Sequence, residues 1–280
     1  MTQTSTARAP QQPRRNDGKT YSRSDRGVSL PAYFTELRRL PVLQRGEEFA
    51  LAHELRECEL ELWCSVLGHP PLAGELLALL RRELPDRDRV PALSRLERLV
   101  PAPEPDAPAY RQRYVAAARA AAADLRAVDP DRTLVVSAVE HLQRTVAARG
   151  GSAARGHLRG VDRRDRAARD ARDRFALMNL RLVVQIARSY AQQHLLEELI
   201  QEGNVGLLKA VGRFDPERGL RFSTYASWWI RHCMNRALVN RQRMVRVPVH
   251  RVAKGRSLLH EATRLVAALG RPPTNEELGR

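Results

Sequence analysis

Cysteines, aromatic residues and long apolar runs are all scarce in this 280-residue chain. The three cysteines, Cys58, Cys64 and Cys233, form no CxxC pair, so neither a zinc module nor a disulfide framework is indicated and a reducing, cytoplasmic setting is expected. No apolar stretch is long enough to span a bilayer, and no apolar signal region is found at the N-terminus. Gly-rich phosphate loops, HExxH and GxSxG motifs are missing, so we expect no enzymatic activity and no cofactor.

Positive charge dominates what is present. The chain holds 48 Lys and Arg against 32 Asp and Glu, with a sequence pI near 11.0. Between Arg213 and Arg256 there are eleven basic residues and two acidic ones. This density favours a phosphate-rich partner over an acidic membrane surface, because the basic run has no broad apolar face that could enter lipid.

Apolar residues recur at helical spacing in most of the chain, which predicts an all-α fold: a multi-helix bundle with a helical insert. We expect a disordered basic arm at 1–27, a pair of helices at 28–67, an insert with Pro-rich loops at 68–165, a principal domain at 166–250 and a final segment at 251–280. Within the insert, GGSAARGHLRG indicates a flexible joint.

The most informative stretch is a predicted helix from Ser223 to about Gln242. Its apolar stripe contains Ala226, Ile230, Cys233, Met234, Ala237 and Leu238. The opposite face contains Tyr225, Trp228, Trp229, His232, Asn235 and Arg236. Aromatic rings beside cations suit a nucleic-acid strand whose bases can be unstacked. The alternative is that Trp228 and Trp229 simply bury against another helix.

Two further features flank this helix. The preceding predicted helix, LLEELIQEGNVGLLKAVGRF, has an apolar stripe that we expect to point inward: Leu196, Leu199, Ile200, Leu207, Leu208 and Val211. Its Gly203 and Gly206 would allow another backbone to approach closely. That helix also contains an acidic, amide-rich patch, which suggests a protein partner beside a basic face. His194, Glu198 and Glu202 are spaced four residues apart, so they would share one face of a helix. One helix supplies too few metal ligands, so we expect no metal site.

Near the end of the sequence, Thr274 and Glu277 form a capping box that predicts a helix start.

The segments NLRLVVQIA, LIQEGNVGLLKAVGRFDPERG, RFSTYASWWIR and RVPVH closely resemble the second conserved region of bacterial RNA polymerase sigma factors of the housekeeping, sigma-seventy family. The resemblance covers about 175–250, and weaker similarity to the family's first and third regions occurs at 30–55 and in LGRPPTNEELGR. It implies a bacterial, nucleoid-associated factor that directs core RNA polymerase to promoters and melts the −10 element. An anti-sigma factor is a further partner that the family admits.

The resemblance also assigns roles to residues. Trp228 and Trp229 would form a wedge at the fork of the duplex. Tyr225 would stack on a flipped adenine of the non-template strand, in a pocket lined by Asp215 and Arg218. Asn179, Arg181 and Leu182 would hold a second flipped base. The full set implied to contact DNA is Asn179, Arg181, Leu182, Asp215, Arg218, Arg221, Phe222, Tyr225, Trp228, Trp229, His232, Asn235, Arg236, Arg243, Arg246 and His250. The set implied to bind the coiled coil of the largest polymerase subunit is Glu198, Gln201, Glu202, Asn204 and Leu208.

Some positions depart from the family pattern. His232 and Asn235 replace the usual Gln–Thr reading pair, Leu220 replaces an aromatic, and Ala253 replaces the Glu that reads the extended −10 dinucleotide. The region that reads the −35 element is not found in the sequence, so a truncated regulator that competes for core polymerase without initiating is the alternative function. A nucleic-acid-processing enzyme is a third hypothesis, which the lack of a catalytic cluster disfavours.

Overall fold

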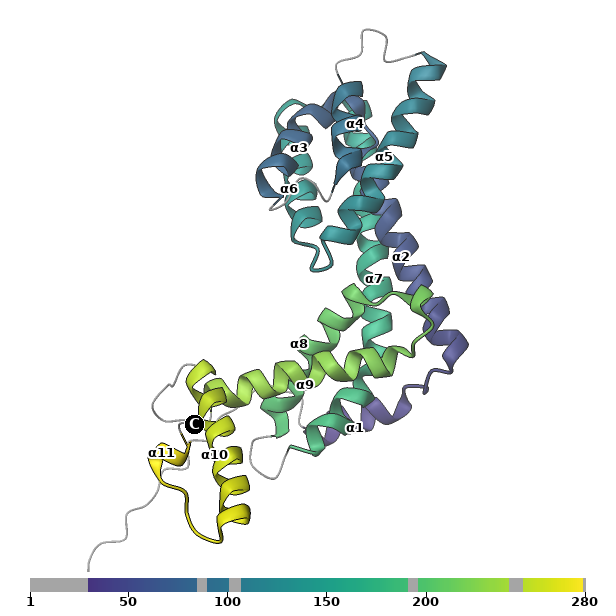
Figure 1. Cartoon of the computed structure of the whole chain (residues 1–280). Coiled ribbons are helices and arrows are strands. Elements are labelled where there is room, and N and C mark those ends of the chain that lie inside the picture. The colour runs from purple at the N-terminus through teal and green to yellow at the C-terminus, as the bar shows by residue number, and fades with distance from the viewer. Residues whose placement is uncertain (1–29, 85–89, 101–106, 191–195, 242–248, 279–280) are drawn as a thin grey trace, which may run out of the picture.

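A computed structural model describes residues 30–84, 90–100, 107–190, 196–241 and 249–278 (Figure 1). Within these ranges the regular structure is helical and no strand occurs, which confirms the predicted all-α fold. The elements are α1 (Leu30–Arg39), α2 (Arg45–Leu67), α3 (Pro70–Glu83), α4 (Pro91–Leu99), α5 (Pro108–Val128), α6 (Thr133–Arg149), α7 (Ser152–Arg188), α8 (Leu196–Arg213), the 3-10 turn η2 (Pro216–Arg218), α9 (Phe222–Arg241), α10 (Val249–Leu269) and α11 (Asn275–Leu278). The predicted arm at 1–27 lies outside the described residues.

Proline and carboxylates define where several helices begin. Pro70, Pro91 and Pro108 occupy the first turns of α3, α4 and α5, where a missing N–H costs no intrahelical hydrogen bond. At the start of α6, the Asp129 carboxylate accepts hydrogen bonds from the backbone N–H groups of Leu134 and Val135, at 3.1 and 2.9 Å. Proline therefore marks the first turn of three helices of the insert.

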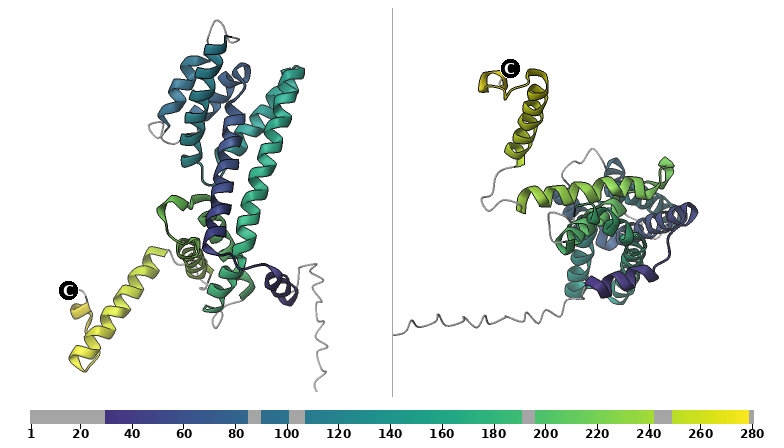
Figure 2. Two further views of the ribbon diagram at one scale, coloured as in Figure 1. Left: turned by 90° about the vertical axis from the view of Figure 1, so that its right-hand side faces the viewer. Right: turned by 90° about the horizontal axis from the view of Figure 1, so that it is seen from below.

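Two apolar cores lie along one pair of long helices. α2 and α7 pack side by side through both, as Figures 1 and 2 show. The insert core includes Leu76, Leu96 and Leu125 from α3, α4 and α5. The second core surrounds Phe175 and Phe222 and draws on α1, α7, α8 and α9. We call the helices around the second core the second lobe. Because α2 and α7 contribute to both cores, these two continuous helices connect the insert to the second lobe.

The predicted flexible joint at 150–160 is wrong. α7 runs unbroken from Ser152 to Arg188, through both Gly156 and Gly160. Ala154 and Val161 are buried, at 8% and 0% exposure. Glycine in a helix costs about 1 kcal/mol relative to alanine, so burial of neighbouring apolar groups outweighs the local preference.

The C-terminal helices confirm the predicted cap. α10 and α11 project beyond the end of α9 (Figure 2). The Thr274 backbone N–H donates to the Glu277 carboxylate at 2.8 Å, and the Glu277 N–H donates to the Thr274 hydroxyl at 3.4 Å. These reciprocal bonds are the capping box that the sequence indicates at the start of α11.

Candidate nucleic-acid interface

α9 separates into the two predicted faces. Phe222, Ala226, Ile230 and Met234 are fully buried, and they place one side of the helix in the second core. α8 crosses this side at very short range. A methyl group added at Gly206 would lie 2.7 Å from the Trp229 carbonyl oxygen and 2.8 Å from the Ile230 Cα. The predicted approach of another backbone is therefore confirmed at Gly206, whereas Gly203 faces side chains, those of Met234, Val183 and Ile230.

The outer face of α9 presents an aromatic group to solvent. Trp228 is 59% exposed and stacks on His232, with ring centroids 5.3 Å apart and an interplanar angle of 9°. Trp229 meets Trp228 edge to face at 4.9 Å. Tryptophan side chains are mostly buried in folded proteins, so this degree of exposure is unusual. The alternative that both tryptophans are core residues is therefore wrong for Trp228.

Trp229 has a different environment. Its indole is half-buried, and the guanidinium carbon of Arg213 lies 5.1 Å from its ring centroid. Its Nε1–H is buried without an acceptor among the described residues. Trp229 thus forms a support behind Trp228, held between α9 and the last residue of α8.

The residues before α9 form a compact polar turn. The Asp215 carboxylate caps η2 by accepting from the Glu217 N–H at 3.1 Å, and it lies 3.4 Å from the Nε of Arg218. Arg56 reaches the same turn from α2, 3.5 Å from Asp215. The predicted neighbours Asp215 and Arg218 are therefore brought together. Tyr225, half-buried in the first turns of α9, packs 6.0 Å from the Phe214 ring.

A pocket lies between α2, α7 and α9. Its volume is about 240 Å³, and Asn179, Arg181 and Leu182 all line it, together with Arg221. The Asn179 side-chain amide donates to the Phe175 carbonyl at 2.8 Å, so its orientation is fixed within α7. The structure therefore gathers around one cavity three residues that the resemblance assigns to one flipped base.

Glu48 is a member of this pocket that the sequence does not reveal. It is 4% exposed, and both of its carboxylate oxygens accept from Arg221, at 2.7 and 2.8 Å. This bidentate pair raises the pKa of Arg221. Residues 48 and 221 are far apart in sequence, so local patterns contain no signal for the contact. Any phosphate that binds Arg221 competes with a carboxylate already in place.

Phe222 corrects one predicted DNA contact. Its side chain is 0% exposed, 4.5 Å from the ring of Phe175 and 5.1 Å from that of Phe214. It is a core residue that anchors the start of α9 and cannot reach a DNA strand in this conformation. His232, Asn235 and Arg236 are exposed on the outer face, as predicted. Arg243 and Arg246 lie outside the described residues, and His250 belongs to the first turn of α10.

The predicted polymerase contacts on α8 differ in how far their side chains are exposed to solvent. Glu198 and Gln201 are exposed, and Leu208, expected from the apolar stripe to point inward, is instead 41% exposed. The prediction that Leu208 points inward is wrong, because the neighbouring Leu207 occupies the core position, at 1% exposure. Glu202 and Asn204 are half-buried, and the Asn204 Oδ1 has no hydrogen-bond partner among the described residues.

The part of the chain that the structure describes lacks two further features. No three His, Cys, Asp or Glu side chains within the described ranges converge as a metal site. None of the helices described is both long and apolar enough to cross a membrane.

Comparison with known proteins identifies the class of this domain. Residues 175–244, which contain α8, α9 and the α7 residues that line the pocket, match the family Sigma-70 region 2. The chain is similar to "RNA polymerase sigma factor SigA" of Bacillus sp, with 48% identity over 110 residues, covering 39% of this chain and 29% of the relative. The protein of the same name from Clostridium acetobutylicum is 47% identical over 113 residues, covering 40% of this chain and 30% of that protein.

These matches define the relationship. Residues 175–244 match the Sigma-70 region 2 family, and the similarity to sigma factors covers 39–40% of this chain. The matched segments span under a third of the length of the curated relatives.

Proposed function

We propose that this chain acts as a sigma factor: it binds core RNA polymerase and recognises and melts the −10 element of promoters. One observation carries the proposal. An exposed tryptophan, Trp228, stands on the outer face of α9 within a sigma-70 region 2 domain, stacked on His232 and backed by Trp229. A ring held in this way can replace a base pair at the fork of an opening duplex.

The energies involved are compatible with this role. Extruding a base costs a few kcal/mol, and stacking on an aromatic side chain returns about 1–3 kcal/mol per base. The Asn179 pocket would take a second extruded base and add its own contacts. Exposed cations such as Arg218 and Arg236 add phosphate attraction that weakens with salt. Two captured bases and the phosphate contacts together offset the cost of opening a short A·T-rich stretch.

The second partner would be the polymerase itself. Glu198, Gln201 and Leu208 are exposed on α8, on a helix whose other side fixes α9. An acidic and amide-rich surface suits a basic protein surface. The resemblance implies that the partner on this side is the coiled coil of the largest polymerase subunit. Docking through α8 would place α9 directly at the promoter. The chain would supply binding energy to transcription, with polymerase performing the chemistry.

The decisive experiment uses core RNA polymerase and a promoter that depends on its −10 element. We would place 2-aminopurine at the flipped adenine and follow fluorescence as the strands part, in parallel with run-off transcription. A rise in fluorescence and a transcript, both requiring this chain, support the proposal. Tight binding to core with neither signal would instead favour a competitor of other sigma factors. DNA cleavage by the purified chain would indicate an enzyme.

A further inference from the structure

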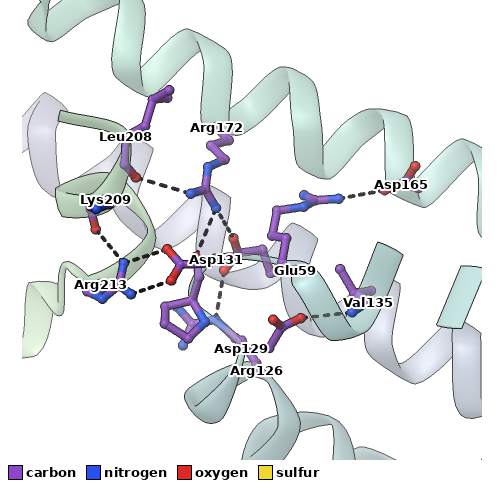
Figure 3. Close-up of polar contacts among 12 residues, drawn as sticks. Glu59, Arg126, Asp129, Asp131, Val135, Asp165, Arg172, Leu208, Lys209 and Arg213 are labelled. Atoms are coloured by element: carbon purple, nitrogen blue, oxygen red, sulfur yellow. Dashed lines mark hydrogen bonds and ion pairs between the residues drawn. The ribbon is translucent and has the colours of Figure 1, made fainter. Parts of the chain in front are cut away.

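The turn between α5 and α6 lies directly against the end of α8 (Figure 3). Arg172 of α7 joins the two: one guanidinium nitrogen donates to the Pro130 carbonyl at 3.2 Å and the other to the Leu208 carbonyl at 3.1 Å. Gly212 makes this approach possible, since a Cβ there would lie 2.3 Å from the Pro130 oxygen. A turn that belongs to the insert is thus seated on the helix that carries the proposed polymerase contacts.

The turn is held in a defined conformation. Asp129 accepts from the first N–H groups of α6, and burial raises the pKa of its carboxyl. Arg132 adopts the left-handed region, with φ of 62°, which a non-glycine residue rarely does without support. Its guanidinium donates to Asp165 of α7 at 2.6 Å, which provides that support. The intervening residue, Asp131, therefore has little freedom to move.

A buried carboxylate stabilises the base of the same junction. Glu59 of α2 is 8% exposed, lying 3.2 Å from Arg126 of α5 and 3.8 Å from Arg172 of α7 (Figure 3). Burial is the larger influence on this carboxyl and raises its pKa, which the two arginines oppose. Helices α2, α5 and α7 are consequently clamped by charge at the point where the turn meets α8.

Asp131 is connected to the tryptophans of α9 through one residue, Arg213. Its two carboxylate oxygens accept from the two terminal nitrogens of Arg213, at 2.7 and 2.5 Å. The same guanidinium covers the Trp229 ring at 5.1 Å, and Trp229 abuts Trp228 at 4.9 Å. A bidentate partner fixes the plane of a guanidinium, and a fixed guanidinium restricts the ring beneath it.

We propose that Asp131 is a positioning residue for promoter opening: through Arg213 it holds Trp229, and through Trp229 the orientation of Trp228. This inference rests on the proposed function and extends it to the insert, for which the sequence offers no role. The insert thereby contributes to strand separation without touching DNA. Freed from Asp131, Arg213 would sample other rotamers and Trp229 would lose its cover.

The test compares Asp131→Asn with a matched control, Glu75→Gln. Glu75 is also an insert carboxylate, 48% exposed against 49% for Asp131, and it pairs with Arg149 at 3.1 Å, far from α9 in sequence and fold. The whole chain is labelled with 5-fluorotryptophan, giving three resonances for the three tryptophans, assigned with Trp229→Phe. Opening by each variant is then measured with core polymerase on the 2-aminopurine promoter.

We expect Asp131→Asn to move or broaden the Trp229 resonance, leave that of buried Trp63 unchanged, and slow opening about fivefold. Glu75→Gln should match the unmodified chain in both measurements. Adding Asp131→Asn to Arg213→Gln should slow opening no further, because Asp131 acts through Arg213. This non-additivity is a result that general destabilisation of the insert would not produce.

Several outcomes overturn the inference. The inference is wrong if Asp131→Asn opens the promoter at the same rate as Glu75→Gln, whether or not the Trp229 resonance moves. It is also wrong if Asp131→Asn and Arg213→Gln slow opening additively in the double variant. If the unmodified chain fails to open the promoter, the proposed function fails and the inference fails with it. Normal opening by the unmodified chain with no specific effect of Asp131→Asn would reject the inference alone.

Discussion

Trp228 and His232 lie one helical turn apart on α9 with their rings nearly parallel, 9° between planes and 5.3 Å between centroids. Both side chains are exposed, so the stack orders a surface ring without contributing to the core. A partner in parallel contact restricts the rotamers of Trp228 and presents one indole face to solvent.

His232→Ala should slow promoter opening about two- to tenfold, because an aromatic pair contributes about 0.5–1.5 kcal/mol beyond its buried area. Stability should change little, since neither ring is in the core. The measurement is the 2-aminopurine opening rate with core polymerase, beside urea denaturation of the free chain. His53→Ala, at an exposed histidine of α2, is the control. Equal opening rates for the two variants would contradict a role for the stack.

The two tryptophans should separate stability from function. Trp228→Ala removes a ring that is 59% exposed, so we expect a change of unfolding free energy within about 0.5 kcal/mol. Trp229→Ala removes a half-buried ring packed on the second core and should cost about 2–3 kcal/mol. Both should lose promoter opening while retaining core polymerase binding. Urea denaturation and core-binding titrations distinguish these effects, and loss of core binding by Trp228→Ala would refute the assignment.

Sequence periodicity could predict the faces of α9 because Ala226, Ile230 and Met234 repeat every four residues. It could not distinguish Trp228 from Trp229. Their difference depends on Arg213, which covers one ring and belongs to another helix. Phe222 was misassigned for a related reason: the resemblance places it beside DNA-contacting residues, but the first turn of α9 rotates it towards Phe175.

Contacts between distant segments were beyond prediction altogether. Asp131 and Arg213 are 82 residues apart, and Glu48 and Arg221 are 173 apart, so no local pattern records either pair. The flexible joint was mispredicted because glycine propensity is local, while the burial that keeps α7 intact involves helices from elsewhere in the chain. The parts of the site that sequence describes are therefore those made within single helices.

Gly206→Ala should destabilise the second lobe by about 1–3 kcal/mol, because the new methyl group would overlap the α9 backbone at Trp229 and Ile230. Separating α8 from α9 would also reduce opening. Gly255→Ala is the control, since nothing lies within 4 Å of its Cβ position on α10 and alanine favours helix. Urea denaturation provides the comparison. Unchanged stability for Gly206→Ala would mean that α8 and α9 are not held in this close contact.

Gln201→Ala combined with Leu208→Ala should weaken binding to core polymerase about tenfold or more while leaving capture of single-stranded −10 DNA unchanged. Both side chains are exposed on α8, so their loss should not perturb the fold. Fluorescence anisotropy of labelled chain against core enzyme measures the first property, and anisotropy of labelled oligonucleotide the second. Val115→Ala, 64% exposed on α5, is the control. Equal loss of both activities would indicate misfolding instead of a lost contact.

His157 should make the stability of the insert depend on pH. Its ring lies 4.9 Å from that of His69, and its Nε2 is buried without a partner among the described residues. Burial, and then the neighbouring His69 and Arg164, lower the pKa of His157 below its ordinary value of 6.5, which a backbone contact at Ser65 partly opposes. The unfolded chain therefore binds a proton at a higher pH than the folded chain does. Stability is fully present above about pH 6.5 and falls as the pH drops towards the folded pKa.

We therefore expect the unfolding free energy to decrease between about pH 7.5 and pH 5.5, and His157→Gln to reduce that decrease. Glu59 and Asp129, whose pKa values are raised by burial, act in the opposite direction, since the folded chain binds their protons more tightly. The informative quantity is thus the difference between variant and unmodified chain in urea denaturation at the two pH values. His53→Gln, at an exposed histidine, should retain the full decrease. A His157→Gln chain with the same pH dependence as the unmodified one would show that this buried ring is not the group responsible.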